Sequence, residues 1–156
     1  MIILLRTLLV LTYALFFGGL TFYTGVVVRI SHDVLSDPMD GGLITQQVTD
    51  VLQWLGAATA GLMLMNALAV RKVCSRRFKV LIGCAVVLAI AVCGLFMVHE
   101  FLDEVIDVAA AEITDRDQFV VGHRRYNQLT TVEWLATLIY LPVAISAWRL
   151  QDQRVA

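Results

Sequence analysis

The stretch VLIGCAVVLAIAVCGLFMV, from Val80 to Val98, contains nineteen consecutive residues without a charge. A helix needs about 20 mainly apolar residues to cross the hydrocarbon core of a bilayer. The basic sequence RKVCSRRFK (71–79) precedes this stretch, and His99 and Glu100 follow it. The pattern therefore predicts a transmembrane helix over residues 80–99 with polar residues at both ends.

Three further uncharged stretches complete a set of four. The first has 22 residues and ends before Arg29, the second has 20 and ends before Arg71, and the last has 15, from Trp134 to Trp148. The corresponding predicted spans are residues 7–28, 51–70 and 129–148. The sequence thus predicts an all-α fold, a four-transmembrane-helix bundle forming a single integral membrane domain over residues 1–156.

The composition supports a membrane protein and argues against several other classes. Of the residues, 59% are hydrophobic and 16% are charged, whereas about a quarter of an average soluble domain is charged. The net charge of -1 lacks the basic excess of a nucleic-acid binder. Three cysteines are too few for a disulfide framework. The lipid bilayer is the predicted partner, and no nucleic acid is expected.

The basic residues predict the orientation. Cytoplasmic loops carry an excess of lysine and arginine, and the loop between spans two and three contains Arg71, Lys72, Arg76, Arg77 and Lys79. With the two chain ends, this side carries eight basic residues and one acid, while the other side carries four basic residues and eleven acids. We therefore expect a multi-pass protein of the plasma (inner) membrane with both termini cytoplasmic. The same basic loop is a candidate site for anionic lipid headgroups, although setting the topology alone explains it.

Glu133 is the most informative polar residue. Fifteen residues at about 1.5 Å each span only about 22 Å, which is short of a hydrocarbon core about 30 Å thick. The fourth span must therefore include Glu133. A carboxylate there is costly unless it faces the protein interior and is paired or protonated. Two interpretations follow, an acid in a functional site or proton path and an interfacial acid held by a structural hydrogen bond.

Polar residues continue from Glu133 along one face of the same helix. The members of this face recur at intervals of three and four: His123, Tyr126, Thr130, Glu133, Thr137 and Tyr140. Lipid offers polar groups no partners, so this face should point into the bundle. Similar polar residues occur at the outer ends of spans two and three. The predicted outer cluster between the helices contains Asp50, Gln53, His99, His123, Tyr126, Thr130 and Glu133.

Two interpretations of the outer cluster remain open. An interhelical hydrogen-bond network needs only polar side chains. A divalent metal site is the alternative, because imidazole and carboxylate are suitable ligands, and its candidate ligands are His99, Asp103, His123 and Glu133. A haem would need two facing histidines deep in the bundle, and both of these lie near its outer end. No cofactor is therefore predicted, and no nucleophile motif or catalytic set is visible.

The outer segments carry two local predictions. Beyond Val98, apolar residues keep a helical spacing, with acids on the opposite side: Phe101, Leu102, Val105, Ile106 and Ala109. The third helix should therefore extend outward as an amphipathic acidic helix. Asp115 or Asp117 is expected to cap the last helix.

In span two, the pairs Gly56/Ala60 and Ala57/Gly61 predict close helix packing within the bundle, with dimerisation as the alternative.

Two motifs carry a family resemblance. GGLTFYTGVVV (18–28) and FVVGHRRYNQLTTVEW (119–134) resemble the first and last spans of the transmembrane-protein-205-like family, also called domain of unknown function 4149. Phe119 and His123 match the last-span motif. Tyr126 stands where that family has a small hydroxyl residue, and Thr130 where it has asparagine. The first motif also resembles copper-resistance D type membrane domains. The resemblance implies a four-helix membrane protein of an uncharacterised family, without established chemistry.

These observations lead to three functional hypotheses. The first is a small polytopic membrane protein that is not an enzyme and has an accessory or structural role, with a membrane-protein partner or a second copy as its partner. The second is a metal-handling protein for copper or another divalent ion that uses the outer histidines and acids. The third is a small transporter subunit that uses Glu133.

Overall fold

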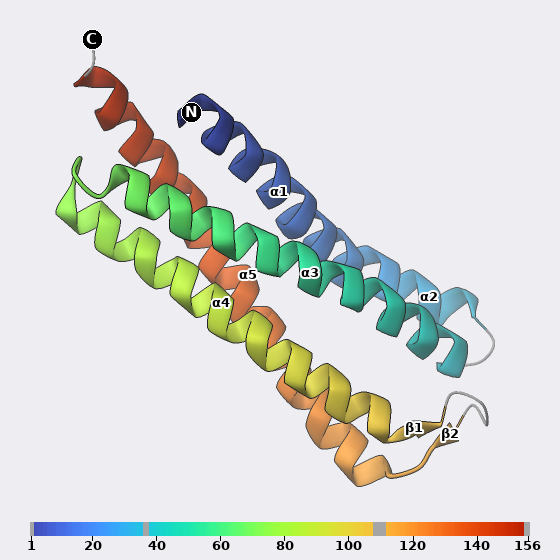
Figure 1. Cartoon of the computed structure of the whole chain (residues 1–156). Helices are drawn as coiled ribbons and strands as arrows, with labels where there is room; N and C mark the ends of the chain where they lie inside the picture. The colour runs from blue at the N-terminus through green and yellow to red at the C-terminus, as the bar shows by residue number, and fades with distance from the viewer. Residues whose placement is uncertain (1, 36–37, 108–111, 155–156) are drawn as a thin grey trace.

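The computed structural model describes residues 2–35, 38–107 and 112–154. It contains four helices that are long and apolar enough to cross a membrane: Ile2–Val34, Asp40–Val70, Ser75–Glu104 and Arg116–Gln153. They pack side by side as an elongated bundle (Figure 1). The predicted all-α four-helix fold is therefore confirmed, and each helix continues past the span predicted for it.

The first membrane helix is continuous but not uniform. It consists of α1 (Ile2–Phe22), a π-helical turn η1 (Tyr23–Val27) and α2 (Val28–Val34). At the end of η1, the N–H of Val28 donates to the carbonyl of Tyr23, five residues earlier. The remaining elements are α3 (Pro38–Val70), α4 (Ser75–Glu104), β1 (Ile106–Asp107), β2 (Glu112–Ile113) and α5 (Arg116–Gln153).

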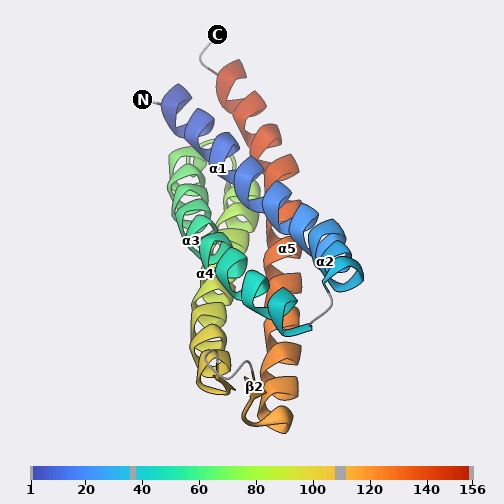
Figure 2. The ribbon, with the colours of Figure 1, turned by 90° about the vertical axis from the view of Figure 1, so that its right-hand side faces the viewer.

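The two ends of the bundle differ. Figure 2 shows both chain termini at one end and the β1–β2 hairpin at the other. We call these the terminal end and the hairpin end. At the terminal end, the guanidinium of Arg6 donates two hydrogen bonds of 3.0 Å to the carboxylate of Asp152. This pair joins α1 to the end of α5, so the first and last helices meet there.

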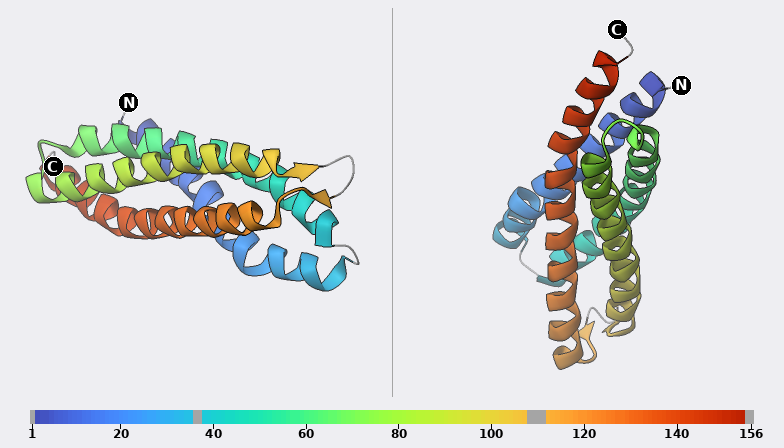
Figure 3. Two further views of the ribbon diagram at one scale, coloured as in Figure 1. Left: turned by 90° about the horizontal axis from the view of Figure 1, so that it is seen from below. Right: turned by 90° about the vertical axis from the view of Figure 1, so that its left-hand side faces the viewer.

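The helices pair in a simple way. α5 packs mainly along α4, and α1 crosses obliquely over α3 (Figure 3). Gly56 of α3 sits where α1 and α4 both approach, because a Cβ at this position would lie 3.0 Å from the Phe16 ring and 3.2 Å from Val92. Ala60, one turn further, is buried. This pair of small residues therefore serves packing within the bundle, as the sequence predicts.

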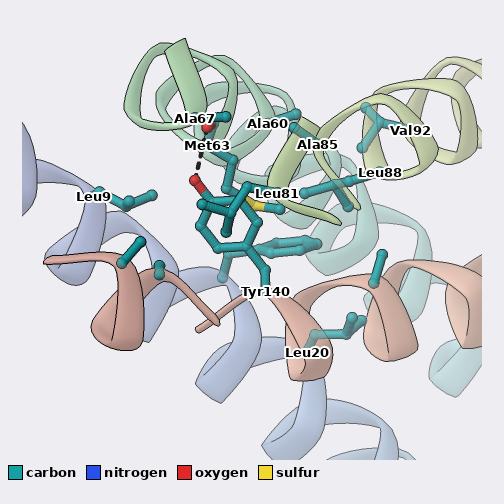
Figure 4. Packing of buried hydrophobic residues seen from close by; sticks show 14 of the residues in the cluster. Leu9, Leu20, Ala60, Met63, Ala67, Leu81, Ala85, Leu88, Val92 and Tyr140 are labelled. Carbon is teal, nitrogen blue, oxygen red and sulfur yellow. Dashed lines mark hydrogen bonds between the residues drawn. The ribbon is translucent and has the colours of Figure 1, made fainter. Parts of the chain in front are cut away.

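The apolar core runs along the bundle axis. Large side chains from all four helices are fully buried in it (Figure 4): Leu9, Phe16, Met63, Leu81, Leu88 and Tyr140. The outward faces are also apolar, with exposed residues such as Leu11, Ile90 and Ile139. A helix that is apolar on all sides is typical of a membrane span, because its outer face contacts lipid.

The end of α4 corrects one prediction. The amphipathic helix extends beyond Glu100 only as far as Glu104, and the chain then forms the antiparallel pair β1–β2. The backbone N–H and the hydroxyl of Thr114 donate to the carbonyl of Val105, at 3.0 and 3.1 Å. β-branched residues at 105, 106, 113 and 114 favour this extended pairing over more helix. Ala109, which the pattern placed on the helix, lies outside the described residues.

α5 begins at the cap that the sequence predicts. The carboxylate of Asp115 accepts a hydrogen bond of 3.0 Å from the backbone N–H of Gln118. This bond, reinforced by the Gln118 side chain, holds the pKa of Asp115 below its usual value. The 38 residues of α5 measure about 57 Å, nearly twice the thickness of a hydrocarbon core. A large part of α5 therefore lies beyond the membrane span.

Candidate polar site between the helices

Gln53 is the centre of the polar site. It lies on α3 with only 2% of its surface exposed. Its side-chain nitrogen is 3.2 Å from Nδ1 of His99 on α4 and 3.3 Å from the hydroxyl of Tyr126 on α5. One amide thus connects three helices.

A second set of contacts lies next to His99, toward the hairpin end. Nε2 of His99 is 3.7 Å from the carboxylate of Asp103, one turn further along α4. The side-chain nitrogen of Gln46 on α3 donates to the same carboxylate at 2.6 Å. Asp103 is 43% exposed, whereas the His99 side chain is 16% exposed. The polar contacts therefore lead from the surface at Asp103 to the buried amide of Gln53.

Glu133 lies deeper in the bundle. It is 2% exposed and lies seven residues beyond Tyr126 on the same face of α5. Within the described part of the chain, three buried side-chain oxygens of this region have no hydrogen-bond partner: Oε1 of Gln53, Oγ1 of Thr130 and Oε1 of Glu133. Most buried polar atoms in proteins are hydrogen-bonded. We name Gln53, His99, Tyr126, Thr130 and Glu133 the hairpin-side cluster.

Two residues of the predicted outer cluster lie elsewhere. Asp50 is exposed on α3. His123 is exposed on α5, where its ring stacks on Phe119 with centroids 5.8 Å apart. The helical face predicted for α5 therefore points into the bundle from Tyr126 onward, and His123 is not part of it.

The predicted metal ligands are not assembled. Of His99, Asp103, His123 and Glu133, only His99 and Asp103 approach each other. Across residues 2–35, 38–107 and 112–154, no group of three or more histidine, cysteine or acidic side chains is placed to hold a metal ion. His99 and Asp103 lie one turn apart on α4, as their spacing predicts. His123 and Glu133 lie on α5 and do not join them.

A second buried polar group contains Asn66, Tyr140 and Trp148, and we name it the terminal-side network. The side-chain nitrogen of Asn66 donates to the Tyr140 hydroxyl at 2.9 Å, and Trp148 donates to the Asn66 oxygen at 2.8 Å. The Tyr140 hydroxyl donates in turn to the carbonyl of Met63 at 2.7 Å (Figure 4). The sequence pattern predicted Tyr140 on the inward polar face of the last helix but not its partners, for which the hint was a single amide, Asn66, within the apolar part of α3.

The basic loop lies at the terminal end. Residues 71–73 form a turn and α4 begins at Ser75. Arg71, Lys72, Arg76 and Lys79 are exposed, and Arg77 is half-buried. At the start of α4, the nearby backbone N–H and guanidinium of Arg77 hold the pKa of the Cys74 thiol below its usual value. The four exposed basic side chains are accessible to headgroups of a surrounding bilayer.

Scans of the chain against protein-family models, curated proteins and solved structures found no match.

Proposed function

We propose that this chain is a small four-span protein of the plasma (inner) membrane with an accessory or structural role and no catalytic activity of its own. The observation that carries the proposal is the position of Gln53, which joins α3, α4 and α5 through His99 and Tyr126. Polar side chains that bond across helices stabilise membrane bundles. The resemblance of the motifs at 18–28 and 119–134 to the transmembrane-protein-205-like family supports this proposal.

The proposed orientation puts both termini in the cytoplasm. The support is the charge of the two ends. The turn at residues 71–73 and the start of α4 lie at the terminal end (Figure 2) and contain Arg71, Lys72, Arg76, Arg77 and Lys79. Basic loops stay cytoplasmic. The same residues would then face the anionic headgroups of the inner leaflet. The acidic hairpin end would lie outside the cell.

The orientation is tested with single-cysteine variants and a maleimide that does not cross membranes. One variant keeps only Cys74, and the other carries Glu112→Cys in a background without the three native cysteines. We expect intact cells to label Glu112→Cys and to label Cys74 only after permeabilisation. The opposite pattern would refute the orientation. Native mass spectrometry of the complex solubilised from the same membranes tests the accessory role, which requires a partner or a second copy in fixed ratio.

A second candidate function, a small transporter subunit, is favoured by Glu133. A carboxyl that is 2% exposed inside a membrane bundle is costly to keep, and such residues mark ion or substrate pathways. An accessory protein whose helices are joined by Gln53 does not need a buried carboxyl at position 133.

A further inference from the structure

An apolar groove lies between α3 and α4 on the outer surface of the bundle. Its volume is about 250 Å³. Six of the residues that line it have small side chains: Ala57, Ala60, Gly61, Ala85, Ala89 and Cys93. Gly61 is exposed, and a Cβ built there would meet no atom of the described chain within 4 Å. The sequence predicted close helix packing at the Ala57/Gly61 pair, but the space beside Gly61 is unfilled.

The groove follows the direction of the two helices, which is also the direction of lipid chains in a bilayer. Its terminal-side half contains Ala85 and Ala89, six and ten residues beyond Lys79 on α4. At 1.5 Å per residue these positions are about 9 and 15 Å deeper than Lys79. One leaflet contributes about 15 Å, half of a hydrocarbon core about 30 Å thick. The acyl chain of a lipid whose headgroup is at Lys79 therefore reaches this half.

An aromatic pair lies at the other end of the groove. Phe96 is the lining residue of α4 nearest to the hairpin end. Trp54 of α3 packs edge-on against Phe96, with ring centroids 5.1 Å apart. The groove is thus bounded by two rings toward the hairpin end and lined by small residues toward the terminal end.

Exposed basic residues continue the groove toward the terminal end, where a turn joins α3 to α4 (Figure 1). Lys79 precedes Val86 by seven residues on α4, and Val86 lines the groove. Arg71, the first residue after α3, follows the lining residue Leu64 by seven. Seven residues are close to two helical turns. One basic residue therefore follows each side of the groove.

Exposed acids take the corresponding places toward the hairpin end. Asp50 precedes Ala57 by seven residues on α3, and Glu100 follows Cys93 by seven on α4. The same two-turn spacing places both acids in line with the groove. An anionic headgroup is therefore attracted at the terminal end of the groove and repelled at its hairpin end.

The two basic residues are available to a ligand. The ion pairs within residues 2–35, 38–107 and 112–154 are Arg6 with Asp152 and His99 with Asp103, so neither Arg71 nor Lys79 has an acidic partner there. Basic sites between membrane helices bind anionic headgroups. A second copy inserted in the same direction would bring like charges together at both ends of the groove, which is unfavourable.

We propose that one anionic phospholipid, with phosphatidylglycerol as the test lipid, binds to this groove. Its headgroup contacts Arg71 and Lys79. One acyl chain lies in the terminal-side half of the groove, against Gly61 and Ala89. The site rests on the proposed four-span membrane protein, to which it adds a lipid ligand, and not on the direction in which the chain is inserted.

The experiment uses the full chain in phosphatidylcholine nanodiscs that contain a small fraction of phosphatidylglycerol with a diazirine in one acyl chain. After illumination, peptide mass spectrometry compares crosslinks at the groove with those at Ile139, an exposed residue of α5. We expect this ratio to be about ten times higher than with phosphatidylcholine carrying the same diazirine. Unlabelled phosphatidylglycerol should compete for the groove and not for Ile139.

A double variant tests the headgroup contacts. Arg71→Gln with Lys79→Gln should reduce the groove crosslinks of phosphatidylglycerol to the level of phosphatidylcholine. The control removes the same charge elsewhere, with Arg76→Gln and Arg149→Gln. Both of these residues are exposed, Arg149 lies on α5, and Arg76 is turned about 80° from Val86 around α4. The control should keep the tenfold preference.

Two further variants test the position of the acyl chain. Gly61→Leu and Ala89→Leu each fill the groove and should remove its crosslinks. Gly83→Leu is the control, because Gly83 is exposed on α4 outside the groove lining, and a Cβ there also meets no described atom within 4 Å. Circular dichroism checks folding, and if one filled variant does not fold, the other decides.

Several outcomes would overturn the proposal. Equal groove crosslinking by the two lipids would mean that the basic residues select no headgroup. Crosslinks that persist in both filled variants would place the chain elsewhere, and a loss of preference in the Arg76/Arg149 control would indicate general attraction to the basic end. A dimer joined through the groove would make a second copy its occupant. None of these results changes the cysteine labelling, which tests the four-span proposal separately.

Discussion

Two buried polar regions join the same two helices, α3 and α5, and they are completed to different degrees. In the terminal-side network, Asn66, Tyr140 and Trp148 form hydrogen bonds of 2.7–2.9 Å, and each polar side-chain atom has a partner. In the hairpin-side cluster, Gln53 forms contacts of 3.2 and 3.3 Å, and three oxygens have none in the described chain.

The two regions therefore differ in what they contribute to stability. In a medium of low dielectric constant, a satisfied hydrogen bond is strong and an unsatisfied polar atom is expensive. The terminal-side network therefore stabilises the bundle by joining α3 to α5. In the hairpin-side cluster, the burial of the Glu133 carboxyl costs stability.

The largest expected effect is in the terminal-side network. Asn66→Ala removes the donor to Tyr140 and leaves the Trp148 N–H without its acceptor. We expect the free energy of unfolding in detergent to fall by about 2 kcal/mol. The measurement is a denaturant titration followed by circular dichroism. Asn127→Ala, on the exposed face of α5, is the control, and an equal loss in both variants would show that the network contributes nothing.

The next effect has the opposite sign. Glu133→Met replaces a buried carboxyl by an apolar side chain of similar length, which removes the cost of burying an unpaired polar group. In detergent, we expect the unfolding free energy to rise by about 1 kcal/mol. Glu100→Met, at an exposed acid on α4, should leave stability unchanged. A loss of stability in Glu133→Met would mean that the carboxyl is a structural group like Asn66.

The smallest effect is at the hairpin end of α5. The Gln118 N–H lowers the pKa of Asp115, so the cap stabilises the folded state above the ordinary aspartate pKa of about 3.9. This contribution is lost as the pH falls through the lower pKa of the folded state. The protection of the Gln118 amide against hydrogen exchange, relative to its intrinsic rate at each pH, should fall over that range. Asp115→Asn keeps a capping side chain and should remove the pH dependence, whereas a change in exchange at Tyr140 would indicate global unfolding.

Most of the fold could be predicted because membrane helices depend on local composition. The uncharged runs gave four helices in the right order, and the cap at Asp115 followed from its place before α5. The end of α4 could not be predicted, because an apolar spacing continues through Val105 and Ile106. What ends the helix is the contact of Thr114 with Val105, which joins residues nine positions apart.

The candidate site was predicted in part. Spacing along α5 correctly placed Tyr126, Thr130 and Glu133 on an inward face. A repeat of 3.5 residues drifts by about 20° per heptad against a straight helix, and His123 at the end of the pattern is exposed. Asn66 could not be found by spacing, because its partners lie 74 and 82 residues away in sequence. Local periodicity predicts the helices, but it does not predict which residues of different helices will be in contact.

The π-helical turn at Tyr23–Val27 makes the first membrane helix tolerant of a single-residue deletion at that one place. Such a turn is an α-helix that has absorbed one extra residue. Deleting one residue within it would restore regular α-helix and leave the two sides facing nearly as before, because the wide turn already takes up the extra residue. Deleting one residue in the regular part of α1 would instead rotate everything on one side against the other by about 100°. A one-codon deletion there would thus exchange lipid-facing and protein-facing sides without altering any remaining side chain.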